Sequence, residues 1–420
     1  MIPLPLDTIA ELALGTLVGE GEITAVKADS REVGAGDLFV GLNAGVQHVD
    51  EARERGAATL VPDNQEAALA AIASLVRGKS DAQVVAVVGS AGKTTTKDIL
   101  GALCAPQVPT IWAERSLNNE IGLPLTVCRL EPETRVLVTE MGMRGLGQVA
   151  ALCAVARPTV VLVPHIGPEH LELLGTVERV AAANAEAIAA LPSGGVAIVP
   201  TTSPLDPFLT REDVVFRRFS PDEVETLGDA TRFSLDGVVV ELELPFTQRH
   251  LASNALAALH AYDALGLPLD RVADGLALVA LSPWRGEEAE LPGGGFVIND
   301  AYNANPDSMR AALVHLAERA GDRRRVAILG EMAELGEQSD EYHVRIGRLA
   351  ADLGIEVLGV GWPARRYTPT VWVESAADVA KAACEYLRPG DAVLVKASRA
   401  VGLEGIAHEI SNFARAWSLY

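Results

Sequence analysis

Residues 84–100, VVAVVGSAGKTTTKDIL, decide the fold of this chain. An apolar, β-branched run ends at Gly89, and after Gly92, Lys93 and Thr94 apolar residues return at helical spacing. This order predicts a buried strand, a glycine-rich loop and a helix, in which backbone N–H groups and the helix N-terminus bind phosphate. The Lys93 ammonium can reach the β- and γ-phosphates of a nucleotide, and the Thr94 hydroxyl can ligate Mg²⁺.

The loop departs from the usual phosphate-binding pattern, G-x-x-x-x-G-K-[ST], because Val87 stands at the first glycine position. The alternative is an ordinary strand-to-helix turn with a solvated lysine. The strand before the loop and the helix after it favour phosphate binding. We expect the phosphate contacts to come from seven consecutive residues, Gly89, Ser90, Ala91, Gly92, Lys93, Thr94 and Thr95.

Length and composition limit the classes of protein. With 420 residues the chain has room for two or three domains, and hydrophobic residues make up 49% of it. No apolar run is long enough to span a bilayer, and the N-terminus lacks the pattern of a signal peptide. Four scattered cysteines predict a reduced, cytoplasmic protein without disulfides or a zinc site. The net charge of −21 disfavours nucleic acid and membrane surfaces as partners.

The order of apolar runs and turns predicts an α/β protein of three domains. Residues 1–82 are typical of a small α/β domain, and residues 83–291 of a central domain whose parallel sheet carries the phosphate loop. Short apolar runs between residues 214 and 244 indicate a β-rich insertion. A glycine-rich join follows, and residues 292–420 alternate strands and helices, as in a second, Rossmann-like, mostly parallel sheet.

Several polar residues stand where a site can form. Glu140 follows a predicted strand, and a carboxylate there either holds a Mg²⁺-bound water or caps the next helix. His170 follows another strand of the same sheet, although a lone histidine is more often structural. Asn184 falls on the apolar stripe of a helix, so its amide is either satisfied structurally or placed for a site. Ser30 and Arg31 occupy a loop corner that either contacts ligand or is only exposed.

The chain resembles the Mur ligases, the ATP-dependent amide-forming enzymes of peptidoglycan assembly. The resemblance covers nearly the whole length and rests on four stretches: GSAGKTTTKD (89–98), NNEIGLPLT (118–126), NDAYNANPDSMRAAL (299–313) and LGEMAELGEQSDEYH (329–343). The last two, and the absence of a D-N-P-R signature, favour the activity that joins D-Ala-D-Ala to UDP-MurNAc-tripeptide. DSREVGAGDLFVGL (29–42) resembles the uridine-binding domain of the family.

The resemblance implies catalytic and metal-binding roles. Lys93 and Thr94 would hold the ATP triphosphate and Mg²⁺, and Glu140 and His170 would be linked to the metal. A further pair would lie near the reacting groups, which makes the expected catalytic set Lys93, Glu140, His170, Asn118 and Asn119.

The resemblance also implies binding residues. Ser30 and Arg31 would contact the UDP end of the substrate. The family has a Gly-Arg pair near the nucleotide, where this chain reads Trp284-Arg285-Gly286. Nucleotide contacts are implied for Asn254, Arg285, Asp300, Tyr302, Asn303 and Asn305. Three more residues match a K-x-S-R segment that faces the centre of the enzyme: Lys396, Ser398 and Arg399.

One departure concerns the second metal. A helix of the family reads A-K-x-E-[IL], and its lysine is carbamylated to bind Mg²⁺, whereas residues 183–187 here read ANAEA. Asn184 cannot capture CO₂, and a neutral amide is a weaker Mg²⁺ ligand than an anionic oxygen. The site therefore works with one fewer charge, or Glu186 or another acid compensates, or activity is reduced.

The implied reaction has two steps. The γ-phosphoryl group of ATP goes to the C-terminal carboxylate of the UDP-MurNAc-tripeptide, and the amine of D-Ala-D-Ala then displaces phosphate from the acyl phosphate. Lys93, Mg²⁺ and either Arg285 or Arg399 would supply positive charge to the phosphoryl group. We expect a monomeric, cytoplasmic enzyme that binds no nucleic acid. The alternatives are another Mur or folylpolyglutamate-type ligase, and a nucleotide-binding homologue that has lost catalysis through Asn184.

Overall fold

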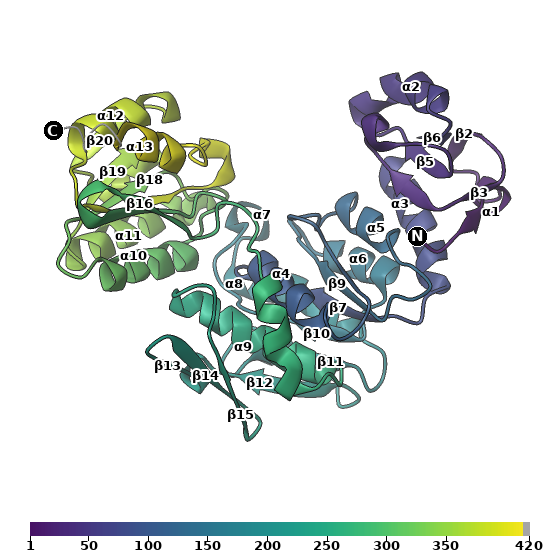
Figure 1. The fold of residues 1–420 in the computed structure, drawn as a ribbon, viewed down its shortest axis with the longest axis horizontal. Coiled ribbons are helices and arrows are strands. Elements are labelled where there is room, and N and C mark those ends of the chain that lie inside the picture. The colour runs from purple at the N-terminus through teal and green to yellow at the C-terminus, as the bar shows by residue number, and fades with distance from the viewer. Residues whose placement is uncertain (415–420) are drawn as a thin grey trace. The chain divides into compact units, whose positions relative to one another are not determined.

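The computed structural model describes residues 1–414 and divides the chain into two compact units (Figure 1). The first unit comprises Met1–His165, Ala182–Pro245 and Ser253–Ala280, and the second comprises Ile166–Ala181, Phe246–Ala252 and the chain from Leu281 onward. Two helices, α8 (Val177–Ala189) and α9 (Arg249–Ala264), contribute to both units. The expected domain boundaries after residues 82 and 291 stay predictions.

The N-terminal part of the first unit is a small α/β fold, as its sequence indicates. Its four-stranded sheet has the order β2 (Gly15–Val18), β6 (Ala58–Pro62), β5 (Asp37–Val40) and β4 (Ala25–Lys27). β1 (Leu4–Pro5) and β3 (Glu22–Ile23) form a separate antiparallel pair. The helices are α1 (Leu6–Ala10), α2 (Val49–Glu54) and α3 (Gln65–Gly78).

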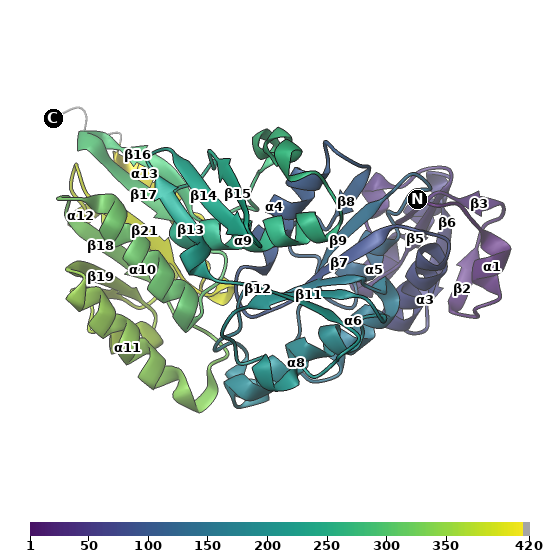
Figure 2. The same ribbon diagram turned by 90° about the horizontal axis from the view of Figure 1, so that it is seen from below.

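The centre of the first unit is a parallel sheet of six strands. Their order is β12 (Val215–Phe219), β11 (Val196–Pro200), β10 (Val160–Leu162), β7 (Gln83–Val87), β9 (Val136–Glu140) and β8 (Thr110–Trp112). Figure 2 shows α4 (Lys93–Cys104) and α9 over one face and α6 (Gln148–Ala156) and α8 over the other. This two-sided cover explains why residues 84–88 are a continuous apolar run without alternation. The short helix α5 (Gly122–Val127) completes this part.

The predicted β-rich insertion is confirmed, but it begins later in the chain. β12 pairs in parallel with β11 and therefore belongs to the central sheet. The insertion is the antiparallel sheet of β13 (Val224–Leu227), β14 (Ala230–Leu235) and β15 (Val238–Leu242).

The second unit holds another six-stranded sheet. Its order is β16 (Glu287–Leu291), β17 (Gly295–Asn299), β21 (Ala392–Lys396), β18 (Arg325–Leu329), β19 (Ile355–Val360) and β20 (Val371–Val373). Only β16 is antiparallel, so the loops after β17, β21, β18 and β19 lie at one edge. In Figure 1, α10 (Pro306–Ala320) and α11 (Ser339–Asp352) cover one face, and α12 (Val379–Tyr386) and α13 (Ile406–Ala414) the other. The short helix α7 (Leu171–Leu174) also belongs to this unit.

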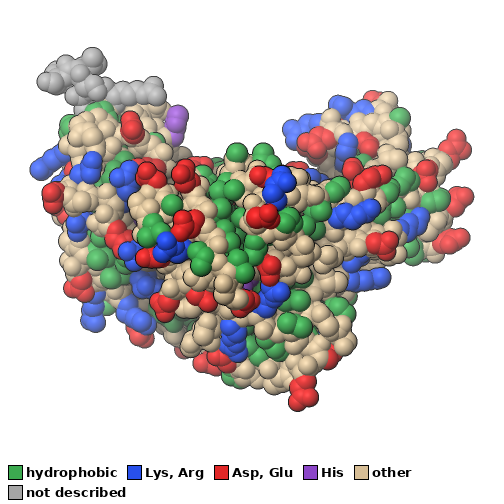
Figure 3. Space-filling model, turned by 60° about the horizontal axis from the view of Figure 1, so that its bottom comes forward, with side chains coloured by type: hydrophobic (Ala, Val, Ile, Leu, Met, Phe, Trp, Pro, Cys, Tyr) green, Lys and Arg blue, Asp and Glu red, His purple; other side chains and the backbone are tan. Residues whose placement is uncertain are grey.

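The surface carries mixed charge. Figure 3 shows Lys and Arg side chains scattered among Asp and Glu over the face in view. All four cysteines are free thiols, three of them buried and Cys384 exposed. Within residues 1–414, no helix combines the length and the apolar composition that crossing a membrane requires.

Candidate active site

The phosphate loop has a backbone that strongly favours glycine at two positions. Gly89 has φ +128° and Gly92, which precedes α4, has φ +81°. A Cβ at Gly89 would lie 2.6 Å from the carbonyl oxygen of His165, and a Cβ at Gly92 would lie 2.5 Å from Oδ1 of Asn254. Both glycines therefore leave room that a side chain would fill. The loop connects strand β7 to helix α4, as the sequence predicts, and Asn254 lies directly against it.

The Asn184 side chain hydrogen-bonds the backbone of this loop. Its Oδ1 accepts a hydrogen bond of 2.7 Å from the backbone N–H of Gly89, and its side chain is 1% exposed. The N–H of Ser90 donates to the His165 carbonyl oxygen at 2.9 Å. Two successive loop residues are therefore fixed from outside the loop, and the amide that the sequence left unexplained is satisfied by the phosphate loop itself.

Glu186 does not take the place of the missing carbamate. Its carboxylate accepts hydrogen bonds from the N–H groups of Gly147, at 2.6 Å, and Ala150, at 3.0 Å. These groups lie at the N-terminus of α6, where a carboxylate also interacts favourably with the helix dipole. The acid two residues after Asn184 is therefore a helix cap.

Two lysines of the motif have different environments. Lys93 is half-buried, and its Nζ donates to the Gly89 carbonyl oxygen at 2.5 Å, so the ammonium lies over the loop. Lys97 is fully buried, and its Nζ donates to the carbonyl oxygens of Ala113 and Arg115 at 2.6 and 2.7 Å. Lys97 braces the segment after β8, which leaves Lys93 as the loop's cation.

Glu140 has the environment of a cation ligand. It is the last residue of β9, opposite Val87 of β7, and is 1% exposed. Its Oε1 accepts from Asn118 Nδ2 at 2.8 Å, whereas Oε2 is buried and has no hydrogen-bond partner among the described residues. A buried carboxylate oxygen without a partner is costly, so the position fits a divalent cation.

A Mg²⁺ ion bound beside Glu140 would need further ligands from the phosphates of the substrate. The Thr94 hydroxyl is buried and lies 3.3 Å from the Ser116 hydroxyl. Among residues 1–414 no three His, Cys, Asp or Glu side chains converge as a ready-made metal site. Mg²⁺ typically takes one or two carboxylates and completes its shell with water and substrate phosphates, which agrees with this sparse set.

Asn119 is a helix cap in this structure. Its Oδ1 accepts from the N–H groups of Ile121 and Gly122, at 3.2 and 2.8 Å, at the start of α5. The neighbouring Asn118 instead reaches Glu140. The expected catalytic role of Asn119 stays a prediction, whereas its structural role explains an asparagine at that position.

His170 lies in the second unit, beside a residue that the sequence did not single out. Its Nδ1 contacts Glu334 Oε2, and its Nε2 lies 3.8 Å from Glu169 Oε1. The backbone also joins these two segments, because the Glu172 N–H donates to the Glu334 carbonyl oxygen at 3.0 Å. The EHLELLG and GEMAELG stretches are thus neighbours in the fold, and His170 is oriented by carboxylates.

The loop after β17 is braced by two residues of the K-x-S-R segment. Lys396 Nζ bonds Asp300 Oδ2 at 2.6 Å and the Asn303 carbonyl oxygen at 3.0 Å. Ser398 Oγ donates to the Ala304 carbonyl oxygen at 3.2 Å. Lys396 and Ser398 are 2% and 3% exposed, so both are internal braces.

The remaining expected nucleotide contacts lie in the same unit. Asn305 caps α10, accepting from the Ser308 N–H at 2.8 Å, and is buried. Arg285 lies over the Tyr302 ring, with Cζ 4.0 Å from the ring centroid. Asn303 is exposed beside them.

Ser30 and Arg31 form a short turn in the N-terminal sheet region. Ser30 is buried and donates from Oγ to Glu51 Oε2 at 3.1 Å. Arg31 is exposed and pairs with Asp29 at 2.6 Å, which lowers the pKa of the Asp29 carboxyl. Arg31 is therefore available at the surface, whereas Ser30 is part of the turn's own bonding.

The candidate residues therefore lie in two clusters, one in each unit. Within the first unit it brings together the phosphate loop with Asn118, Glu140, Asn184 and Asn254. Within the second unit it gathers the residues after β17 and β21. Sequence reasoning missed Ser116, His165, Glu334 and Trp284. Glu334 could have been found from the sequence, because it lies in the GEMAELGE stretch. His165 could not, because it contacts Ser90 through its backbone carbonyl oxygen, which does not depend on the residue type.

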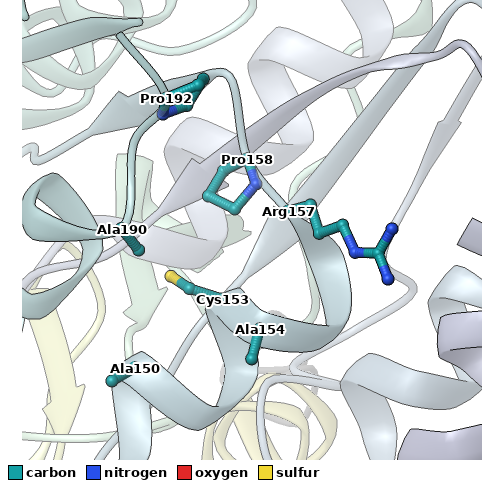
Figure 4. A pocket seen from close by; sticks show the side chains of 7 residues that line it. All are labelled: Ala150, Cys153, Ala154, Arg157, Pro158, Ala190 and Pro192. Atoms are coloured by element: carbon teal, nitrogen blue, oxygen red, sulfur yellow. The ribbon is translucent and has the colours of Figure 1, made fainter. Parts of the chain in front are cut away.

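A cavity of about 360 Å³ lies elsewhere in the first unit. Figure 4 shows its lining, which comes from α6 and the segments beside it: Ala150, Cys153, Ala154, Arg157, Pro158, Ala190 and Pro192. Pro158 lies before β10, at the opposite edge of the sheet from the loop that follows β7. Burial raises the pKa of Cys153 to about 12, so this thiol stays protonated at neutral pH. The cavity is not part of the phosphate site.

Comparison with known proteins identifies related domains over most of the chain. The family model of the Mur ligase middle domain matches residues 87–262, and that of the Mur ligase glutamate ligase domain matches residues 284–399.

Curated relatives and solved structures agree with these matches. UDP-N-acetylmuramoyl-tripeptide–D-alanyl-D-alanine ligase of Escherichia coli is 33% identical, with 86% of each chain covered. The enzyme of that name from Mycobacterium bovis is 33% identical, with 97% of each covered. MurF of Acinetobacter baumannii superimposes with a TM-score of 0.85 at 25% identity, covering 98% of this chain and 99% of that one. MurF of Thermotoga maritima in complex with ADP gives 0.81 at 26% identity, covering 94% and 98%.

Replacing Asn184 with leucine tests its support of the loop. Asn184→Leu keeps the approximate volume but leaves the Gly89 N–H without its acceptor, so we expect the Kd for ADP to rise about 10-fold. Isothermal titration calorimetry measures this change. Asn64→Leu is the matched control, because Asn64 caps α3 in the same unit and should leave the Kd unchanged. An unchanged Kd in Asn184→Leu would contradict the proposed support.

Proposed function

The chain belongs to the Mur ligase family, and from that premise we propose that it joins D-Ala-D-Ala to UDP-MurNAc-tripeptide with hydrolysis of ATP to ADP and phosphate. One observation carries the proposal. The phosphate loop, with Lys93 over it and the buried Glu140 beside it, lies in a chain that aligns over 97% of its length with a ligase of that activity. A nucleotide-dependent amide ligation is the chemistry that these groups support.

The loop residues bind and orient the nucleotide. The Gly89–Thr95 loop holds the triphosphate through its backbone N–H groups from Ala91 onward and through the Lys93 ammonium, because the N–H groups of Gly89 and Ser90 already bond Asn184 and His165. The γ-phosphoryl group therefore meets the tripeptide carboxylate in a fixed position. Thr94 and Glu140 would hold Mg²⁺, which when bound offsets phosphate charge. Asn118 orients the Glu140 carboxylate, and His170, oriented by Glu334, is proposed as a further metal-linked residue.

The remaining roles follow the same reaction. Arg285 and the loop of Asp300, Asn303 and Asn305, together with Asn254, are proposed to contact the nucleotide. Ser30 and Arg31 are proposed to contact the UDP group of the tripeptide substrate. The acyl phosphate formed in the first step loses phosphate when the dipeptide amine attacks it, so the protein must exclude water during that interval. We also propose that the enzyme is a cytoplasmic monomer.

The absence of a carbamate is part of this proposal. Asn184 is engaged with Gly89, and Glu186 caps α6, so neither supplies an additional carboxylate to the metal. We propose that the enzyme works with one fewer negative charge near the phosphates than a carbamylated lysine would give. The neutral amide instead stabilises the loop directly.

The alternative ligase activity has less support. FolC of Escherichia coli superimposes with a TM-score of 0.60 at 18% identity, which shows a common fold and nothing about its substrates. The alternative of a binding protein without catalysis is distinguished by the assay that follows.

Phosphate release should require both substrates. With ATP and Mg²⁺, we expect release only when UDP-MurNAc-tripeptide and D-Ala-D-Ala are both present, with the pentapeptide product seen by mass spectrometry. Lys93→Ala removes the loop cation and should lower kcat by about 100-fold. Lys79→Ala, an exposed lysine outside the loop, is the control and should retain full activity. Phosphate release at the same rate with and without D-Ala-D-Ala would contradict the ligase activity.

Activity should also be independent of carbon dioxide. Because Asn184 cannot form a carbamate, removing bicarbonate is expected to leave the rate of the wild type unchanged. Asn184→Lys loses the acceptor for Gly89 and should be less active than the wild type, even in added bicarbonate. Initial rates in degassed and bicarbonate-supplemented buffer measure both effects. An inactive wild type with activity gained in Asn184→Lys would mean that catalysis has been lost here.

A further inference from the structure

Arg399 is the exposed cation of the K-x-S-R segment. Lys396 and Ser398 are buried braces, whereas the Arg399 side chain is 51% exposed. Its Cζ lies 4.4 Å from the centroid of the Trp284 ring and 5.9 Å from that of Tyr302. The guanidinium therefore lies beside two aromatic rings at the edge of the sheet, and half of the side chain remains exposed.

The surroundings favour an anionic ligand. Arg285 lies over the same Tyr302 ring, with Cζ 4.0 Å from the centroid, so two guanidinium groups stand beside one aromatic residue. The nearby carboxylate, Glu404 Oε1, is 3.5 Å from Arg399 and is part-buried. The exposed half of the Arg399 side chain can take a further anionic partner beside Glu404.

The backbone of Trp284 adds an independent observation. Trp284 has φ +62°, a left-handed conformation that is strained for a bulky residue. Glycine would adopt this conformation without strain. The chain keeps the strained tryptophan, whose carbonyl oxygen accepts from the Tyr302 N–H at 3.2 Å and whose ring supports Arg399.

We propose that Arg399 binds the free carboxylate of the incoming D-Ala-D-Ala dipeptide and that Trp284 is its positioning residue. The inference rests on the proposed function. The dipeptide has two methyl side chains and two ionisable groups, and its amine must be left free to attack. The carboxylate is therefore the ionisable group that the protein can bind, and a guanidinium can bind both of its oxygens. The triphosphate already has its own cation, Lys93, in the first unit.

The test compares the dipeptide with its C-terminal amide in the full-length enzyme. We expect the wild type to prefer the acid over the amide in kcat/KM by about 10- to 100-fold. Arg399→Ala should lower kcat/KM for the acid and leave that for the amide unchanged, so the ratio falls to about 1. Because the ratio is compared between variants, the different reactivity of the two amines cancels.

Two further variants separate recognition from folding. Trp284→Gly relieves the strained backbone, so its melting temperature should equal or exceed that of the wild type while the KM for the acid rises. Arg365→Ala is the matched control, because Arg365 is also exposed and stacks on two rings, with Cζ 3.8 Å from Trp372 and 4.6 Å from Trp362. This control should leave the acid-to-amide ratio unchanged.

The outcomes are distinct. An acid-to-amide ratio that stays at the wild-type value in Arg399→Ala overturns the inference and leaves the proposed function intact. A loss that falls equally on acid and amide also overturns it, because Arg399 would then act on the phosphoryl group or on the fold. If the wild type releases no phosphate in response to any dipeptide, the proposed function itself fails. A fall of the ratio to about 1, with an unchanged KM for ATP, supports the carboxylate site.

Discussion

The hydrogen bond from the Gly89 N–H to Asn184 Oδ1 is the contact on which the central site depends. A phosphate loop needs its backbone turned inward, and such a backbone is strained and entropically costly unless neighbouring elements hold it. Here α8 supplies the amide, His165 in the loop after β10 supplies a carbonyl oxygen for Ser90, and α9 places Asn254 against Gly92. The loop can therefore bind phosphate without first becoming ordered, which favours affinity.

The second unit separates structural polar groups from those exposed at its sheet edge. Lys396, Ser398 and Asn305 all match motif residues of the family, yet each is buried and bonded within the loops it joins. These internal bonds fix the edge on which Arg285 and Arg399 are displayed. A site built in this way holds the half-buried Arg285 and the exposed Arg399 beside loops that hydrogen-bond one another, which limits the motion of the loops.

Much of the fold follows from the sequence, because apolar β-branched runs and glycine-rich turns are local signals. Residues 84–88 predict a buried strand, followed by a glycine-rich loop and a helix, and this order is present. The partners of polar residues are not local signals. The sequence placed Asn184 on an inward face but could not say that Gly89 was its donor, 95 positions away. The capping role of Glu186 was missed for the same reason, since the Gly147 N–H that it accepts from lies 39 residues earlier in the chain. The left-handed backbone of Trp284 was missed because tryptophan normally avoids that conformation.

The central claim is that the nucleotide site phosphorylates the tripeptide carboxylate before the dipeptide reacts. Tripeptide labelled with ¹⁸O in its terminal carboxylate tests this claim most directly, with mass spectrometry of the phosphate released during ligation. The account predicts that one labelled oxygen passes from the carboxylate to phosphate, because the acyl phosphate breaks between carbon and oxygen when the amine attacks. Phosphate without label would mean that ATP is cleaved by water, and would contradict the ligase mechanism.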